Sequence, residues 1–223
     1  MTPFAPLIAV ALAVSLASPA ETPSALESQP EGWVDLLSKA GPSLKGWTRA
    51  PLKVGETLPE SSQWSLDPAT GVLLCKGNGG HEWLRWDQEL GDFVYHVEWR
   101  FTPVEGKKGY NSGIYARNSA DATVWHQAQT GGTPKGFMFG ATQGEGKPRS
   151  FNLAKQVTDD RVKPPGEWNT YEVTCRGPVM SLWVNGAEVC ALKDCGAKSG
   201  FVGLEAEGYR IEFRNVKVKT LGR

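Results

Sequence analysis

Side chains that can transfer protons or hold an anion follow one another along the segment Asp92–Phe101. Side chains alternate between the two faces of a β-strand. One face of this segment is apolar, with Phe93, Tyr95, Val97, Trp99 and Phe101; the other carries His96, Glu98 and Arg100. Imidazole and carboxylate groups act as acids and bases, and guanidinium groups bind anions. The polar face of Asp92–Phe101 is therefore predicted to be the working surface.

Other segments add polar groups to such a surface. The same alternation applies to three further segments. It points Tyr115 and Arg117 outward in the segment Asn111–Arg117, and Trp125, Gln127 and Gln129 outward in the segment Thr123–Thr130. Near the C-terminus it points Glu205 and Glu207 outward. If these segments share one sheet, its outer face combines acids, arginines, amides and a tryptophan. Antiparallel sheets also commonly expose a polar face that only makes ion pairs worth little each. Both interpretations stay open from the sequence.

Two further histidines occupy different settings. His126 shares its face with Val124 and Ala128, which points to the core and is typical of a structural histidine. His81 follows two glycines, in a predicted loop that could edge a cleft.

The elements that must position these groups are short. The chain has 26 Gly, 15 Pro and no long amphipathic pattern, and Asn185-Gly186 between Val179–Val184 and Ala187–Leu192 predicts a hairpin. Many short strands divided by turns indicate an all-β sandwich or jelly roll of antiparallel sheets.

The N-terminal residues are typical of a targeting sequence. Residues 1–20 are apolar and end Ser18-Pro19-Ala20, which predicts a secretory signal peptide and a secreted or periplasmic protein; a retained membrane anchor is the alternative. Residues 21–31 contain two prolines, several polar residues and no periodic pattern, so a flexible lead-in is expected, with the domain occupying 32–223.

Four cysteines fall after the predicted cleavage site: Cys75, Cys175, Cys190 and Cys195. An even number in an exported chain predicts two disulfides with three possible connectivities, and buried free thiols are the alternative.

Composition narrows the ligand class. Lys plus Arg and Asp plus Glu both number 24, and no basic stripe is present, which argues against nucleic acid. Nine tryptophans are many for this length. Some must fill the core, while others are suited to stack on sugar rings. A carbohydrate ligand is expected, with no membrane span in the mature chain; the sequence leaves the oligomeric state open.

A series of short motifs runs through almost the whole mature chain. It comprises Gly32-Trp33, Gly46-Trp47, Gly91-Asp92-Phe93, Glu98-Trp99-Arg100, Asn111-Ser112-Gly113-Ile114-Tyr115, Trp183-Val184-Asn185-Gly186, Gly203-Leu204-Glu205 and Phe213-Arg214-Asn215. In this order the chain resembles the DUF1080 family, the 3-keto-disaccharide hydrolase or 3-keto-glucoside 1,2-lyase and 3-keto-2-hydroxy-glucal hydratase domain. The resemblance implies a concanavalin-like jelly-roll sandwich. The family's usual Glu-x-Gln pattern is Trp125-His126-Gln127 here, so an acid is missing.

The resemblance implies a sugar with a ketone at C3, which acidifies the C2 proton. The site then needs a base, an enolate stabiliser and an acid. The candidates are His126 or Glu98 as base, Arg117 or Arg100 as stabiliser, and Glu205 as acid. The residues expected to bind substrate are His96, Arg100, Tyr115, Trp125 and Gln127.

A divalent metal could replace the arginine, with ligands from His96, Glu98, His126 or Glu205. Trp125 in place of an acid favours a second hypothesis, a non-catalytic carbohydrate-binding module. A secreted interaction domain without a sugar ligand is a third.

Overall fold

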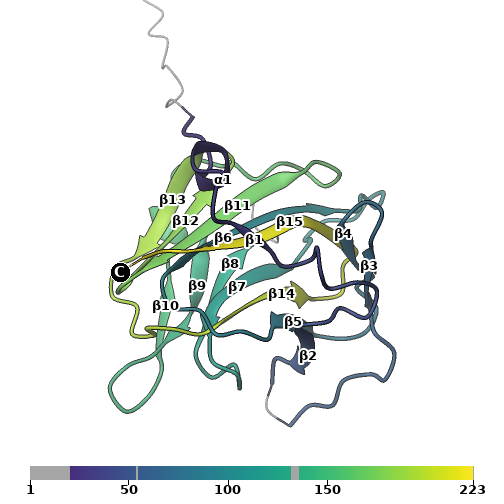
Figure 1. Cartoon of the computed structure of the whole chain (residues 1–223), viewed down its shortest axis with the longest axis horizontal. Helices are drawn as coiled ribbons and strands as arrows, with labels where there is room; N and C mark the ends of the chain where they lie inside the picture. The colour runs from purple at the N-terminus through teal and green to yellow at the C-terminus, as the bar shows by residue number, and fades with distance from the viewer. Residues whose placement is uncertain (1–20, 54, 132–135, 223) are drawn as a thin grey trace, which may run out of the picture.

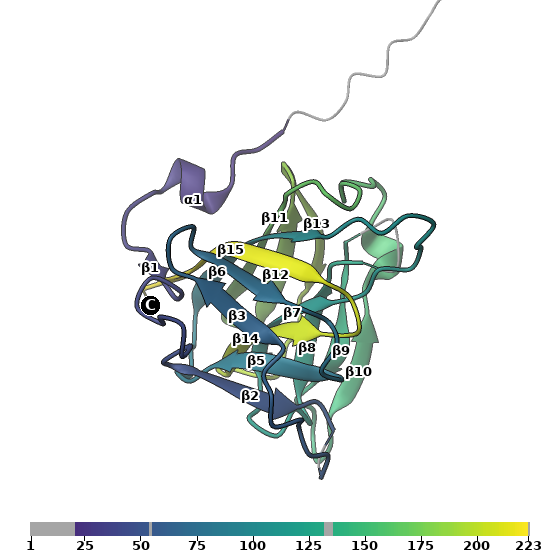
Figure 2. The same ribbon diagram turned by 90° about the vertical axis from the view of Figure 1, so that its right-hand side faces the viewer.

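The computed structural model describes residues 21–53, 55–131 and 136–222 as two antiparallel sheets stacked face to face. Figure 2 shows β15, β6 and β3 in one layer and β14, β5 and β2 in the layer beside it. The prediction of an all-β, concanavalin-like sandwich is confirmed. The expected hairpin is also present, since Asn185 and Gly186 have φ of 40° and 106° between β12 and β13.

The larger sheet has eight strands in the order β13-β12-β11-β6-β15-β4-β3, with β1 paired to β15 (Figure 1). Their bounds are β1 Val34–Asp35, β3 Trp64–Asp67, β4 Val72–Cys75, β6 Phe93–Phe101, β11 Asn169–Arg176, β12 Val179–Val184, β13 Ala187–Leu192 and β15 Ile211–Thr220.

The smaller sheet has seven strands in the order β10-β9-β8-β7-β14-β5-β2. They are β2 Trp47–Pro51, β5 Glu82–Trp86, β7 Gly113–Asn118, β8 Trp125–Gln129, β9 Met138–Thr142, β10 Arg149–Asn152 and β14 Phe201–Ala206. The helical elements of the described residues are short: α1 Ala25–Ser28 and the 3-10 turn η1 Ala154–Gln156. None of the described helices is long and apolar enough to cross a membrane.

The core lies between the sheets and follows the predicted alternation. The apolar row of β6 faces Ile114 and Ala128 of the smaller sheet, and all are nearly inaccessible to solvent. Burying each large apolar side chain contributes roughly 1.5–3 kcal/mol, so this layer fixes the register of every strand that it includes.

Sheet membership corrects one prediction. β6 lies at the middle of the larger sheet, whereas β7, β8 and β14 are neighbours in the smaller one. The polar faces of the two sheets point away from a shared core, so His96, Glu98 and Arg100 are on the opposite surface of the molecule from Tyr115 and Glu205.

The segment 21–31 is not the unstructured lead-in that its composition suggested. Ser24 and Glu27 form a capping box at α1, and the Glu172 carboxylate of β11 accepts the backbone N–H groups of Ala25 and Leu26 at 2.6 and 3.0 Å. Thr22 also donates its backbone N–H to Gly186 O at 2.7 Å. This segment therefore packs on the larger sheet, as Figure 1 shows for α1 above β11 and β12.

The expected disulfides do not form. Cys75, Cys175, Cys190 and Cys195 are all free and buried. Burial raises the pKa of the Cys75 thiol to about 12 and that of the Cys190 thiol to about 11, so both behave as small apolar side chains.

Candidate functional site

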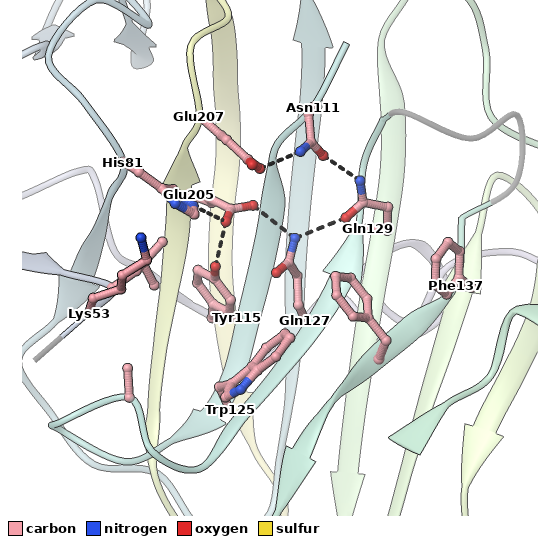
Figure 3. Close-up of a pocket in the computed structure, with 13 residues that line it drawn as sticks. Lys53, His81, Asn111, Tyr115, Trp125, Gln127, Gln129, Phe137, Glu205 and Glu207 are labelled. Atoms are coloured by element: carbon pink, nitrogen blue, oxygen red, sulfur yellow. Dashed lines mark hydrogen bonds and ion pairs between the residues drawn. The ribbon is translucent and has the colours of Figure 1, made fainter. Parts of the chain in front are cut away.

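A pocket of about 510 Å³ lies on the outer face of the seven-stranded sheet (Figure 3). Its walls come from β7, β8, β9 and β14 and from the loops beside them. The lining residues are Leu52, Lys53, His81, Asn111, Tyr115, Ala122, Trp125, Gln127, Gln129, Phe137, Phe139, Glu205 and Glu207.

Glu205 is the charged centre of this pocket. It lies on β14, between β5 and β7, and its residue is only 2 % exposed. Three side chains hydrogen-bond to its carboxylate: Tyr115 OH at 2.7 Å, Gln127 Nε2 at 2.8 Å and His81 Nε2 at 2.8 Å. Three partners compensate for the loss of water around a buried carboxylate, which holds it in one orientation.

His81 connects the buried carboxylate with solvent. It lies in the loop between β4 and β5, and its side chain is 42 % exposed. The hydrogen bond to Glu205 raises the pKa of His81, and the charges of Glu205 and Glu207 add to this against the effect of burial. An imidazole held by a carboxylate at one nitrogen can exchange a proton with a ligand at the other.

A chain of amides joins Glu205 to the second acid, Glu207. Gln127 Nε2 also donates to Gln129 Oε1 at 2.9 Å, Gln129 donates to Asn111, and Asn111 donates to Glu207. Burial, followed by the charge of Glu205, raises the pKa of Glu207. This acid therefore keeps its proton to a higher pH than an ordinary glutamate does.

The opposite wall of the pocket is aromatic. The rings of Trp125 and Phe139 meet edge to face with centroids 5.2 Å apart, and Phe137 lies 5.5 Å beyond Phe139. Figure 3 places Lys53 on the His81 side and Phe137 on the far side. One wall thus presents charge and hydrogen bonds, and the other presents apolar ring surface.

The pocket also holds a group that fits a divalent cation. Ligand atoms of His81, Glu205 and Glu207 all lie within 4.8 Å of one another. Imidazole nitrogen with carboxylate oxygen suits zinc, manganese or iron. Of the metal ligands predicted from sequence, Glu205 belongs to this group, while His96, Glu98 and His126 do not.

The structure brings Tyr115, Trp125, Gln127 and Glu205 together in this pocket. Tyr115 is bonded to Glu205, and burial, followed by the Glu205 charge, keeps its pKa well above the usual range. Its hydroxyl therefore stays protonated and orients the carboxylate.

Arg117 was predicted to face the ligand, and this is wrong. Its backbone turns at φ 52°, and its guanidinium is fully buried, bonded to Asp92 at 2.7 Å and to the carbonyl oxygens of Gly91, Gly177 and Ala197. A guanidinium with all these partners ties the β7 end to neighbouring loops and is not available as an enolate stabiliser.

His126 is likewise a structural residue. It is 1 % exposed, and its Nδ1 and Nε2 lie 3.1 Å from Ala116 O and 3.0 Å from Thr142 Oγ1. Burial lowers the pKa of His126 to about 4, so it stays neutral in the core. The prediction that it acts as the catalytic base is wrong.

The residues predicted on β6 form a separate network on the other sheet. Glu98 accepts from Arg214 at 2.7 Å and from Asn215. Burial opposes its charge, but His96 at 3.9 Å and these two hydrogen bonds outweigh burial and lower the pKa of Glu98 to about 2. Arg100 pairs with Glu212 at 2.7 Å and stacks on Trp168. None of these residues lines the pocket, so Glu98 as base, Arg100 as stabiliser and His96 as a substrate ligand are corrected.

Sequence reasoning did not assign a role to Lys53, Asn111 or Glu207, and it left His81 without one. Lys53 and His81 come from loops, whose course no alternation rule predicts. Strand alternation predicted the correct faces for Glu207 and Gln129. It did not predict that both residues lie near Glu205.

A comparison with curated proteins found no match. Among solved structures, the carbohydrate-binding module CBM66 from Bacillus subtilis is similar with a TM-score of 0.57 and 14 % identity, covering 78 % of this chain and 96 % of that one. A protein provisionally described as a glycosyl hydrolase from Parabacteroides distasonis has a TM-score of 0.57 and 17 % identity, covering 92 % and 100 %.

The β-glucanase of Bacillus licheniformis is similar with a TM-score of 0.52 and 12 % identity, covering 85 % of this chain and 97 % of that one. At these identities the three structures support the fold alone. The sequence also identifies the family, because residues 32–219 match the model of the 3-keto-alpha-glucoside-1,2-lyase-like domain. The chain therefore belongs to the 3-keto-alpha-glucoside-1,2-lyase-like domain family.

Proposed function

We propose that the pocket cleaves glycosides whose sugar carries a ketone at C3. The observation that carries the proposal is the His81–Glu205 pair. The half-exposed imidazole is held by a buried carboxylate that accepts three hydrogen bonds, and an aromatic wall lies opposite this pair. This arrangement can bind a sugar ring and remove a proton from it. Membership of the family supports the same substrate.

His81 is the proposed base. A C3 ketone acidifies the proton on C2, so the neutral imidazole can accept it as the C2–H bond breaks. The electron pair enters the C2–C3–O system as an enolate. Glu205 stabilises the imidazolium that forms, and the Lys53 ammonium at the pocket edge stabilises the enolate oxygen.

Loss of the leaving group completes the cleavage. The enolate pair forms the C1–C2 double bond while the C1–O bond breaks, and the departing oxygen takes a proton. Glu207 is the proposed donor, because its raised pKa keeps it protonated nearer to neutral pH. Adding water across the C1–C2 double bond then gives the free 3-keto sugar.

The remaining residues bind and orient the ring. Trp125 and Phe139 present faces against which the C–H surface of a pyranose can lie. Asn111, Gln127 and Gln129 supply amide groups for the sugar hydroxyls. Tyr115 holds Glu205 and is a positioning residue.

A 4-nitrophenyl 3-keto-glucoside deuterated at C2 would test the proposal. Release of nitrophenolate should be slower than from the unlabelled substrate, because the C2–H bond breaks in the reaction. His81→Ala should abolish the release. Glu98→Gln is the matched control, since Glu98 lies on the other sheet. Absence of turnover under all conditions would overturn the proposal.

The aromatic wall favours a second candidate function, binding of carbohydrate without catalysis. Trp125 stands where the resemblance leads one to expect an acid, and it adds ring surface instead of proton transfer. Measurable glycan affinity that depends on Trp125, combined with no turnover of the 3-keto-glucoside, would establish that function.

We also propose that the protein is exported, on the basis of residues 1–20, which lie outside the described part of the chain. Cleavage after Ala20 would leave Glu21 at the new N-terminus, next to Thr22, which is already bonded to Gly186. N-terminal sequencing of the protein recovered from the periplasm or medium tests this; an intact Met1 would contradict it.

A further inference from the structure

The side chains of Gln127, Gln129 and Asn111 form a continuous chain of amide groups between Glu205 and Glu207 (Figure 3). The proposed reaction gives a role to each acid and none to the connection between them. An amide group donates hydrogen bonds through its NH₂ group and accepts them through its oxygen. The direction in which each amide points therefore decides what its neighbour must do.

Two groups that can only accept hydrogen bonds set this direction. The Glu205 carboxylate takes one N–H of Gln127 at 2.8 Å, and the backbone oxygen of Gly131 takes one N–H of Gln129 at 2.5 Å. Turning either amide around would bring its oxygen against another acceptor and break the hydrogen bond. Both glutamines are buried, so water does not compensate for such a reversal.

The orientation of Asn111 follows from that of the two glutamines. The second N–H of Gln127 goes to Gln129 Oε1 at 2.9 Å, and the second N–H of Gln129 goes to Asn111 Oδ1 at 2.5 Å. The Asn111 oxygen thus faces a donor, and its NH₂ group is turned to Glu207 Oε2 at 2.5 Å. Because an amide N–H only donates, Oε2 of Glu207 must accept.

The backbone under the chain is shaped to admit it. The Gln127 side chain crosses Gly113 of β7, where an added Cβ would overlap the Gln127 amide. Gly113 is the register partner of Gln129 on β8. Its neighbour Ser112 donates its hydroxyl to the backbone oxygen of Glu205 at 2.8 Å, which fixes β7 against β14. A side chain at position 113 would therefore displace the amide that begins the chain.

The bond from Asn111 restricts where Glu207 carries its proton. The carbonyl oxygen of a protonated carboxyl group is a better acceptor than its hydroxyl oxygen, so an accepting Oε2 leaves the proton on Oε1. We infer that Asn111 and Gln129 are positioning residues that keep the proton of Glu207 on Oε1, where a ligand in the pocket can take it. This role rests on the proposed function, in which Glu207 donates a proton to the leaving group.

Infrared spectroscopy tests the position of the proton without any turnover. The C=O stretch of protonated Glu207 is the band that appears when the wild type is acidified and is missing in Glu207→Gln. In Asn111→Leu the carbonyl oxygen loses its donor, so this band should shift to higher frequency. Asn152→Leu, at an exposed position on β10, is the matched control and should leave the band unchanged. A band that stays in place in Asn111→Leu removes Asn111 from this role.

Steady-state kinetics of a 3-keto-glucoside test the consequence for catalysis. Asn111→Asp keeps the size of the side chain but replaces the N–H donor by an oxygen, which draws the proton of Glu207 towards the chain. We expect kcat to fall about tenfold or more, with KM changed by no more than about a factor of two or three. Gly113→Ala removes no group of the chain and should also lower kcat, because it displaces Gln127. Unchanged kcat in both variants contradicts the positioning role.

The two measurements separate this role from the proposed reaction. Turnover by the wild type, combined with an unshifted band in Asn111→Leu, refutes the positioning role and leaves the proposed function intact. A shifted band without turnover by the wild type refutes the proposed function and supports the placement of the proton. Asn152→Asp, the kinetic control, should turn over the substrate as the wild type does, since its amide only caps Ala154.

Discussion

His81 Nε2 lies 2.8 Å from Glu205 Oε1, although 124 residues separate them in the sequence. The pairing of β5 with β14 explains this proximity, because Glu82 at the start of β5 is opposite Ala206 at the end of β14. The antiparallel register pairs Glu205 with Trp83 and, continued by one residue, sets His81 opposite Glu207, so Glu205 is the diagonal neighbour of His81. The contact depends on strand register, and a slip of one residue would destroy it.

Replacing Glu205 by Gln should lower kcat/KM for a 3-keto-glucoside by about 10²–10⁴-fold, the usual effect of losing a group that supports proton transfer. It should also change the pH profile. His81 must be neutral to accept a proton, so activity falls as pH drops below its raised pKa. Without the Glu205 charge that pKa falls, and the acid limb should move to lower pH. An unmoved limb would remove His81 from the role of base.

Tyr115→Phe should have a smaller effect than Glu205→Gln. It removes one of three hydrogen bonds to the carboxylate and leaves the His81 contact in place. We expect a decrease in kcat of about tenfold, corresponding to roughly 1.4 kcal/mol, with KM little changed. The comparison uses steady-state kinetics of the two variants; equal losses would mean that Tyr115 itself transfers a proton.

Trp125→Ala should weaken binding rather than chemistry. Stacking of a sugar on this ring is expected to contribute about 0.5–1.5 kcal/mol, so KM should rise up to about tenfold while kcat stays within a factor of two or three. Trp86→Ala is unsuitable as a control because Trp86 packs on Trp47. The matched position is Trp168, which directly precedes β11 and stacks on Arg100 and Arg214 of the other sheet. A large drop in kcat with Trp125→Ala would contradict a purely binding role.

Treatment with EDTA should leave the activity intact, because Lys53 supplies a positive charge at the pocket from the chain itself. Added Zn²⁺ should inhibit, since His81, Glu205 and Glu207 can bind it together and His81 then no longer accepts a proton. Lys53→Met should lower kcat by more than tenfold. Activity lost to EDTA and restored by Mn²⁺ would instead assign the enolate-stabilising role to a cation at these three residues.

Glu172→Gln should destabilise the fold by about 2–3 kcal/mol, because it weakens the pair with His96 and the two bonds to α1. Burial opposes charge on His96, but the hydrogen bond to Glu172 at 2.8 Å and the charges of Glu172 and Glu98 outweigh burial and raise the pKa of His96. The positively charged residue next to His96 is Lys217, its register partner on β15. The stabilisation is complete below the unfolded pKa near 6.5 and is lost as pH rises through the folded one.

Urea unfolding at several pH values measures this contribution. The difference in unfolding free energy between wild type and Glu172→Gln should be largest below about pH 6 and should decrease as the pH rises from about 6.5 through the raised pKa of folded His96. Glu188→Gln, at an exposed position on β13, is the control. A difference that is constant with pH would show that His96 does not titrate with folding.

Strand alternation predicted much of the pocket. It placed Tyr115, Trp125, Gln127 and Glu205 on the outer face of their strands, because the apolar residues between them must fill the core. It also placed His126 on the core side. What alternation cannot supply is which sheet a strand joins, and for that reason Glu98 and Arg100 were grouped with residues on the far side of the molecule.

Backbone irregularity and loops account for the remaining differences. Arg117 leaves the alternation because its φ is positive, and the carbonyl oxygens that bind it come from segments distant in the sequence. His81 reaches Glu205 through the pairing of β5 with β14, which no local pattern contains. The four cysteines are buried as free thiols, so their even number did not predict disulfides.

The docking of α1 has a practical consequence for anyone expressing the domain. The family match begins at residue 32, but the folded unit begins earlier, at the residues that cover Glu172. A recombinant chain trimmed to Gly32 would expose a carboxylate and an imidazole that now lie 2.8 Å apart beneath that cover. The boundary for crystallisation or assay should therefore be set at Glu21, with any affinity tag placed at the C-terminal end.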